Sequence, residues 1–421
     1  MKRIEKTSFR LFHFLPFLCL LLANPACKNS DQPTNNKAFA VPVNISTELP
    51  WSERMALSII KRSPEAWMND FSKEPSWNYT HGLIMLSILR TWDASKKALY
   101  FDYVKSYADT MIYPDGSIRD YQLTEFNIDH VNPGKFLFGL YEETGQENYK
   151  TAISTLKHQL DWQPRTKDGG FWHKLRYPWQ MWLDGLYMGA PFYAEYAMRN
   201  NEPALFDDIA LQFTLMEQHA RDPKTGLLYH GWDQSRSQRW SDPQTGLSPN
   251  FWGRAIGWYS MALVDALDFF PEGHPKRDTL IAVLRRTMEA VEKVQDPGSG
   301  MWYQVLDQPG REGNYLESTA SCMFTYAMAK GVNNGYLDKH YKEVAEKAFA
   351  GILENVIRVD GSGEVHLENC CAVAGLGGNP YRDGSYEYYV SEPIRDNDPK
   401  GIAPFILASL ELEKAAKSGT Y

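Results

Sequence analysis

Apolar residues recur at three- and four-residue spacing along most of the chain, as in Tyr149, Ile153, Leu156 and Leu160. Side chains at this spacing share one face of an α-helix, so the pattern predicts a mainly helical protein. A helix-start signal agrees, since Pro133 stands in the first turn of one predicted helix. Twelve helices are expected, over residues 51–62, 78–91, 95–112, 133–145, 146–162, 183–199, 203–221, 252–270, 275–294, 316–332, 338–356 and 401–416.

The connections between these helices alternate in length. They are short after the even-numbered helices, and long and rich in Gly, Pro, Asp and aromatic residues after the odd-numbered ones. The alternation predicts six helical hairpins whose long loops all lie at one end, and loops longer than about a dozen residues are usually functional. Six hairpins that close into a ring form an all-α (α/α)6 toroid, which is the expected fold. An open α-solenoid is the alternative.

One predicted helix is apolar on every face. Between Arg176 and Glu195 the only charged residue is Asp184, and aromatic and aliphatic side chains surround it. A helix that is apolar all round is a buried helix, and burial disfavours the ionised form of a lone carboxylate. We therefore expect a raised pKa at Asp184, which suits a general acid near neutral pH. A structural aspartate satisfied by backbone amides at the helix start is the alternative.

Other chemically capable side chains stand in the long loops or where the even-numbered helices begin. One of them, Arg254, is the only charged residue between Asp242 and Asp265. Because all these positions share one end of the predicted hairpins, they are expected to converge on one cavity, which indicates an enzyme. Besides Asp184, the candidates are Trp77, Tyr79, Asp129, His173, Trp182, His230, Trp252, Arg254 and Trp258.

The residue types in this set indicate a sugar ligand. Tryptophan and tyrosine rings stack on pyranose faces, and carboxylates and imidazoles bind hydroxyl groups. Each tryptophan taken singly is also compatible with a place in the core. The imidazoles of His173 and His230 are equally compatible with structural roles, and the chain has no HxH or HxxxH metal spacing.

The N-terminal residues have the features of an export signal. Four basic residues precede an apolar run over 11–23, which is too short for an ordinary transmembrane span. The following residues resemble the end of a bacterial lipoprotein signal, with Asn24 where leucine is usual. The resemblance implies that residues 1–26 are removed and that Cys27 is lipidated. The protein is then an exported, periplasmic or cell-envelope lipoprotein that meets the membrane only through Cys27. Soluble secretion after cleavage is the alternative.

One domain is expected to follow this signal. No linker rich in Pro, Ser or Gly and no break in composition interrupts residues 45–415. We therefore expect a flexible tether over residues 27–45 and a single (α/α)6 domain over residues 46–421.

Charge and cysteine content exclude several classes of protein. Removal of the signal, which holds four basic residues and one acidic residue, takes the formal net charge from −8 to −11. An acidic chain without a basic run is a poor nucleic-acid binder. The cysteines beyond the signal, Cys322, Cys370 and Cys371, form no CxxC motif, so neither a disulfide scaffold nor a zinc site is indicated.

At these residues the chain resembles the unsaturated rhamnogalacturonyl hydrolases of glycoside hydrolase family 105. The matching pieces cover roughly residues 50–415 in the family's order. Family 88, which acts on unsaturated glucuronyl ends of glycosaminoglycan fragments, shares the fold and a similar pair of aspartates, and is the nearest rival. The pieces are Asn127–Gly134, Gln180–Asp184, Trp252–Arg254 with Gly257-Trp258, Gly384–Tyr389 and Asn397–Gly401.

The resemblance implies the reaction as well as the substrate, an unsaturated uronyl oligosaccharide made by a polysaccharide lyase. Asp184 protonates C4 of the terminal C4=C5 double bond and assists the addition of water at C5, after which the hemiketal opens. Asp129 holds ring hydroxyls and tunes Asp184, and no metal or organic cofactor is required. Arg254 is the candidate for orienting the uronate, because a guanidinium fork suits a carboxylate. The subsite is shaped by His173, His230, Trp252, Arg254 and Trp258.

Two further functions stay open at this point. The first is ordinary inverting hydrolysis, which needs two carboxyl groups about 6.5–9.5 Å apart with room for water. The second is a sugar-binding lipoprotein without catalysis, in which buried lone carboxylates have no purpose. Only hydration of an unsaturated uronide removes the conjugated double bond of the substrate.

Overall fold

The computed structural model describes residues 39–417, and each of the twelve predicted helices is present in it. The predicted signal over 1–26, Cys27 and the tether up to residue 38 lie outside the described residues. The helices are α1 (Trp51–Arg62), α2 (Tyr79–Ser95), α3 (Ala98–Met111), α4 (Gly134–Thr144), α5 (Glu147–Trp162), α6 (Leu183–Arg199), α7 (Leu205–Ala220), α8 (Gly253–Leu267), α9 (Arg277–Glu292), α10 (Ser318–Asn333), α11 (His340–Asn355), α12 (Tyr386–Ser391) and α13 (Pro399–Lys417).

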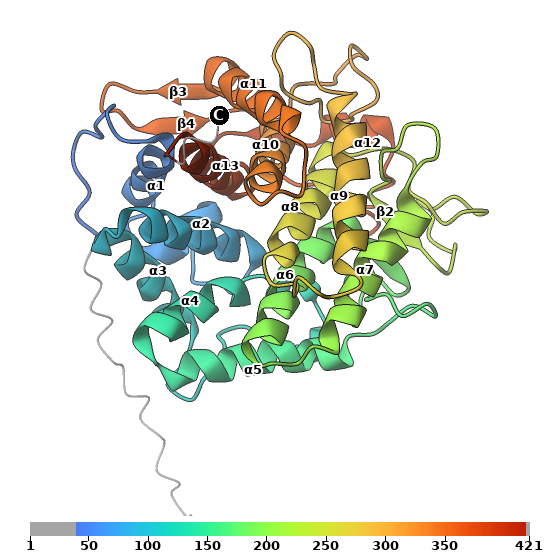
Figure 1. Ribbon diagram of the computed structural model, residues 1–421, viewed down its shortest axis with the longest axis horizontal. Coiled ribbons are helices and arrows are strands. Elements are labelled where there is room, and N and C mark those ends of the chain that lie inside the picture. Colours follow the sequence, from blue (N-terminus) through green and yellow to red (C-terminus); the bar gives the residue numbers. More distant parts are fainter. Residues whose placement is uncertain (1–38, 418–421) are drawn as a thin grey trace, which may run out of the picture. The chain divides into compact units, whose positions relative to one another are not determined.

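Six of these helices form a closed inner ring. Each of α2, α4, α6, α8, α10 and α13 contacts the next, and α13 contacts α2. The chain can be followed by colour in Figure 1 from α1 in blue to α13 in red, where the first and last helices lie near one another. The outer helices each pack against the inner helix that comes just before them in the chain, and these outer helices are α3, α5, α7, α9 and α11. The remaining outer helix, α1, packs against α13. The closed ring confirms the predicted (α/α)6 toroid over the open solenoid.

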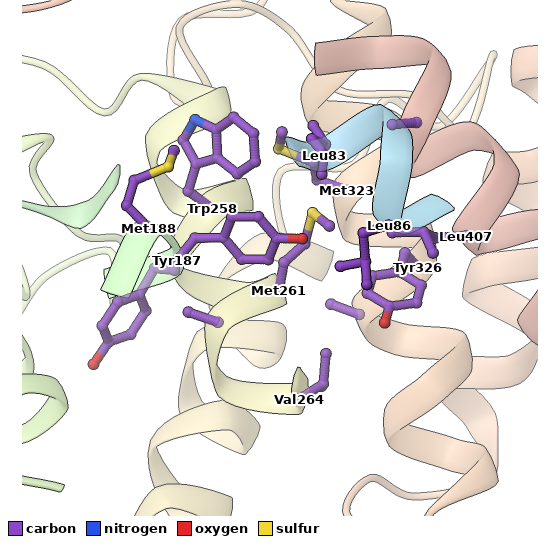
Figure 2. Packing of buried hydrophobic residues seen from close by; sticks show 14 of the residues in the cluster. Leu83, Leu86, Tyr187, Met188, Trp258, Met261, Val264, Met323, Tyr326 and Leu407 are labelled. Carbon is purple, nitrogen blue, oxygen red and sulfur yellow. The ribbon is translucent and has the colours of Figure 1, made fainter. Parts of the chain in front are cut away.

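The sequence pattern explains which helices are inside. Every residue of α8 is buried, whereas its outer neighbour α9 keeps Arg285, Arg286 and Glu289 exposed. Apolar side chains on all faces require neighbours on all sides, which only a place in the inner ring supplies. Figure 2 shows labelled side chains of α2, α6, α8, α10 and α13 packed together, among them Tyr187 and Trp258.

The long loops contain short elements that the helical period did not predict. Within residues 39–417 these elements are three antiparallel pairs of strands, α12 and three 3-10 turns. Each strand is only two or three residues long. Strands this short have too few residues to show an alternating pattern. The turns are η1 (Ala66–Phe71), η2 (Leu123–Glu125) and η3 (Ile128–His130), and the pairs are β1 (Gln180–Trp182) with β2 (Gly231–Asp233), β3 (Ile357–Val359) with β4 (Val365–Leu367), and β5 (Cys370–Cys371) with β6 (Ile394–Arg395).

Packing against the domain begins before residue 46, the boundary expected from the sequence. Phe39 meets the ring of Tyr103 edge-on at 5.3 Å, and the amide of Ile45 donates to the carbonyl of Ser362 at 2.8 Å. The Ile45 side chain is buried. Residues 39–45 therefore belong to the folded domain, because an apolar side chain and a cross-chain hydrogen bond hold them there.

Two observations bear on the cysteines and the membrane. Cys322, Cys370 and Cys371 are buried free thiols. Within residues 39–417, no helix combines the length and the apolarity needed to cross a membrane.

Lys135 of α4 is an ionisable side chain buried inside the ring. Its Nζ lies 3.4 Å from the centre of the Tyr187 ring and has no hydrogen-bond partner within the described part of the chain. Burial lowers the pKa of Lys135 from its ordinary 10.5 to about 7, although Asp265 acts in the opposite direction. A buried ammonium without an acceptor costs stability.

We predict that Lys135→Met stabilises the protein at pH 7 by about 2–4 kcal/mol. Because the folded pKa is depressed, the unfolded chain binds more protons between pH 7 and about pH 10.5, so wild-type stability rises with pH in that window. The substitution should flatten this rise. Denaturant unfolding at pH 7 and pH 10 measures it, with exposed Lys73→Met as the control. A less stable Met variant at pH 7 would show that the ammonium has a stabilising partner.

Candidate active site

The first contact of the site is created by the pairing of β1 with β2. Asp184 stands in the first turn of α6, directly after β1, in which Trp182 is opposite Gly231. The amide of Leu183 donates to the carbonyl of His230 at 3.0 Å. This register places the two side chains together, with Asp184 Oδ2 and His230 Nε2 3.1 Å apart.

The pKa of Asp184 corrects a prediction from the sequence. Burial does raise it, as expected, but the neighbouring imidazole of His230, and after it that of His173, outweigh burial, and the pKa lies below its ordinary value of 3.8. The prediction of a raised pKa is therefore wrong for the free protein, because the carboxylate is not alone. Apart from each other, these two buried atoms have no hydrogen-bond partner among the described residues.

The second carboxylate, Asp129, lies in η3 and is held by Lys174 and His173. Asn127 caps the turn by accepting the amide of Asp129 at 3.2 Å. Lys174 forms a short ion pair with one carboxylate oxygen, and His173 Nε2 lies 3.3 Å from the other. Burial raises the pKa of Asp129, but Lys174 and then His173 oppose it, and the pKa is lowered overall. Lys174 was not predicted, although it directly follows His173 in the sequence.

His173 stands between the two carboxylates. Burial lowers its pKa to about 4, against the attraction of Asp129 and Asp184, so its ring is neutral near pH 7. The ring stacks on Trp182 with centroids 4.5 Å apart. A Cβ at Gly185 would lie only 2.9 Å from His173 Nδ1, so the glycine permits this approach of the ring to α6.

Aromatic rings surround His230. Trp182 meets it edge-on at 5.5 Å, and Trp252 lies at 4.8 Å. The hydroxyl of Tyr389, from α12, is 2.7 Å from His230 Nδ1. Tyr389 belongs to the stretch Gly384–Tyr389 that resembles family 105, but no role was expected for it from the sequence. Its helix is too short for a periodic signal.

Arg254 meets this group only at Trp252, where its Cζ lies 4.7 Å from the centre of the indole ring. Its guanidinium is buried and donates to the carbonyl of Cys371. Burial lowers the pKa of Arg254, but Cys371, Glu317 and Asp398 together raise it above its ordinary value. Groups of the protein itself therefore stabilise the charge of Arg254.

The remaining predicted residues, Trp77, Tyr79 and Trp258, pack inside the protein near these groups. Trp77 donates to the carbonyl of His130 at 2.8 Å and so supports the segment that carries Asp129. Trp258 stacks on Tyr187 at 4.9 Å and meets Tyr79 edge-on at 6.2 Å. The structure thus gathers Asp184, Asp129, His173, Trp182, His230 and Trp252 into one group.

A separate cluster on the β3–β4 hairpin offers possible metal ligands. Asp360, Glu364 and His366 bring ligand atoms within 4.8 Å of one another. Arg62 already pairs with Glu364 at 3.0 Å and neutralises it. We assign this hairpin an ion-pair role.

A buried carboxylate, Asp129, and a largely buried one, Asp184, with imidazole and indole neighbours at the loop end of an (α/α)6 toroid are the arrangement of a glycoside hydrolase. The family model of Glycosyl Hydrolase Family 88 matches residues 51–416. The chain belongs to this family.

Similar proteins agree with the assignment. A solved glycoside hydrolase from family 105 of C. acetobutylicum ATCC 824 is 47% identical with a TM-score of 0.84, over 87% of this chain and 100% of that one. The 24.9 kDa protein in the picA locus of Rhizobium radiobacter is 40% identical over 53% of this chain and 97% of its own. The unsaturated rhamnogalacturonyl hydrolase YesR of Bacillus subtilis is 28% identical over 73% of this chain and 84% of its own.

Proposed function

We propose that this glycoside hydrolase removes a 4,5-unsaturated uronyl residue, of the galacturonyl type, from the non-reducing end of lyase-generated oligosaccharides such as rhamnogalacturonan fragments. The observation that carries the proposal is the contact of Asp184 with His230, whose facing atoms lie 3.1 Å apart and have no other hydrogen-bond partner among the described residues. The family and the relative named for unsaturated rhamnogalacturonyl hydrolysis support the substrate class.

Asp184 is the catalytic acid and base in this proposal. Its proton is transferred to C4 of the enol ether, and the oxygen of a water molecule adds to C5. The proton released by the water returns to Asp184, so the residue is regenerated. The hemiketal at C5 then opens, and the next sugar leaves with its hydroxyl group. One carboxyl therefore serves both half-reactions, as general acid and then as general base.

The lowered pKa of free Asp184 means that the acid form must be created on binding. The substrate brings its own carboxylate and excludes water, and both effects disfavour a second negative charge nearby. We expect proton uptake when the uronide binds. Asp129, which is already paired with Lys174, stays ionised and is available to hold ring hydroxyls.

The rings of Trp182 and Trp252 supply the apolar faces of this subsite, with His173 and His230 as hydrogen-bonding groups between them. Trp77, Tyr79 and Trp258 support these walls from behind. Arg254 acts through the backbone of Cys371, which it holds in place.

The experiment that tests the function is ultraviolet absorbance of lyase-generated oligosaccharides incubated with the enzyme. Loss of absorbance with release of the next sugar is the expected result, fastest on unsaturated galacturonyl ends. The matching saturated oligosaccharides are the control. Preference for unsaturated glucuronyl ends would change the sugar but keep the reaction. Cleavage of the saturated control would instead show an ordinary glycosidase.

We further propose that the enzyme is exported and anchored to the cell envelope through lipid on Cys27. The basic start, the short apolar run and the cysteine that follows support this proposal. Cys27→Ala is expected to release the protein from the membrane fraction with unchanged specific activity. A wild-type protein found only in the soluble periplasmic fraction would contradict it.

A further inference from the structure

Tyr389 is buried in the site, and the reaction proposed above does not use it. It lies in α12, whose first turn is capped by Ser385 accepting the amide of Tyr388 at 3.0 Å. Its side chain is 0% exposed, and its hydroxyl lies 2.7 Å from His230 Nδ1. The other imidazole nitrogen of the same histidine faces Asp184. The three side chains therefore form a continuous row from tyrosine to carboxylate.

The position of Tyr389 is fixed from two sides. Its ring stacks on Trp252 with centroids 5.7 Å apart. Gln304, which is also buried, accepts the indole N–H of Trp252 at 3.1 Å and donates to the carbonyl of Tyr389 at 3.0 Å. One amide thus ties both aromatic residues, so the tyrosine hydroxyl is aimed by the fold rather than free to rotate away.

The direction of the hydrogen bond between Tyr389 and His230 follows from which of the two groups carries the shared proton. Burial raises the pKa of Tyr389 well above its ordinary value, so the phenol keeps its proton. Within residues 39–417, His230 Nδ1 is the partner of that hydroxyl, and a buried O–H is expected to donate. A neutral imidazole that accepts at Nδ1 carries its proton on Nε2, and Nε2 is the atom 3.1 Å from Asp184.

We propose that Tyr389 is a positioning residue that holds His230 in the tautomer with its proton on Nε2, directed at Asp184. This inference rests on the proposed role of Asp184. A proton on Nε2 stabilises the ionised form of the free Asp184 carboxylate. The hydroxyl of Tyr389 keeps the imidazole oriented while Asp184 gives and regains its proton. The other titratable or charged groups around this row are His173, Asp129, Tyr388, Cys371 and Arg382.

Tyr389→Phe removes the hydroxyl and retains the ring that stacks on Trp252. We expect kcat on an unsaturated disaccharide to fall about 10–100-fold with KM changed less than about 2-fold, as for loss of an interaction that acts in the chemical step. The kcat/KM profile is expected to move to higher pH, because Asp184 loses an aligned donor. The matched control is Tyr259→Phe, which deletes another buried hydroxyl, one that donates to the carbonyl of Phe213.

A double-mutant cycle separates positioning from a direct role. If Tyr389 acts through His230, Tyr389→Phe has no further effect on kcat in a His230→Ala background. An equal loss in both backgrounds, or a wild-type kcat in Tyr389→Phe, would overturn the proposal.

A second measurement does not depend on activity. The ¹⁵N NMR signals of the His230 imidazole should show a proton on Nε2 and a lone pair on Nδ1 in the wild type. They should show a mixture of tautomers in Tyr389→Phe. Signals that are the same in both proteins would refute the positioning role, whereas failure of the enzyme on every unsaturated uronide would refute only the proposed function.

Discussion

Asp184→Asn is expected to lower kcat on an unsaturated disaccharide by about 10²–10⁴-fold or more, since one group serves both half-reactions. Asparagine has the size of aspartate and keeps hydrogen-bonding capacity beside His230, but it cannot deliver a proton. The helix start should be unaffected, because asparagine can accept the same backbone hydrogen bonds as aspartate in the first turn. Circular dichroism should therefore match the wild type.

A pH series adds a stability test for the same variant. The folded pKa of Asp184 is lowered, so its ionised form stabilises the native state above the ordinary pKa of 3.8, and this contribution is lost as pH falls through the folded value. Asp184→Asn should lack that dependence. Exposed Asp102→Asn on α3 is the control for charge alone. If Asp184→Asn is folded and turns over normally, the acid lies elsewhere, and Asp129 becomes the next candidate.

Arg254→Ala is expected to destabilise the fold by about 3–5 kcal/mol, the usual cost of removing one member of a buried charged network. Its guanidinium is 1% exposed, holds the carbonyl of Cys371, and has the carboxylates of Glu317 and Asp398 as charged neighbours. The substitution leaves these buried carboxylates without that cation. Denaturant unfolding measures the loss.

Arg254→Lys is the matched comparison. It keeps the charge but not the planar fork, so it should recover part of the stability. The resemblance to family 105 implied a different role, in which Arg254 orients the uronate, and that role predicts a lower kcat/KM for Arg254→Ala. Unchanged stability of Arg254→Ala together with a fall in kcat/KM would support that earlier prediction.

The helical architecture could be predicted from the sequence because its signals are local. The predicted ranges 51–62 and 183–199 coincide with α1 and α6, and the short and long connections alternate as expected. Helical spacing repeats every few residues, so a segment shows it without knowledge of its neighbours. The loop-end positions of Asp129, His173, Asp184 and His230 also followed from the chain order.

The charge state of the site could not be predicted in this way. The sign of the pKa shift of Asp184 depends on a partner that only the β1–β2 register brings to 3.1 Å. Strands of three residues carry no periodic signal, and a pKa depends on the nearest charge as strongly as on burial. Lys174 escaped prediction for the same reason, since its pairing with Asp129 is a contact across loops.

The sequence by itself determined the helices, their order and the end of the hairpins at which the motif residues meet, because periodicity and connection length are local properties. Only the tertiary structure decided which of those residues touch: His230 against Asp184, Tyr389 behind His230, and Arg254 turned to the carbonyl of Cys371. Such contacts join segments distant in the sequence. Their distances and charges follow from how the loops pack, and no local pattern records that packing.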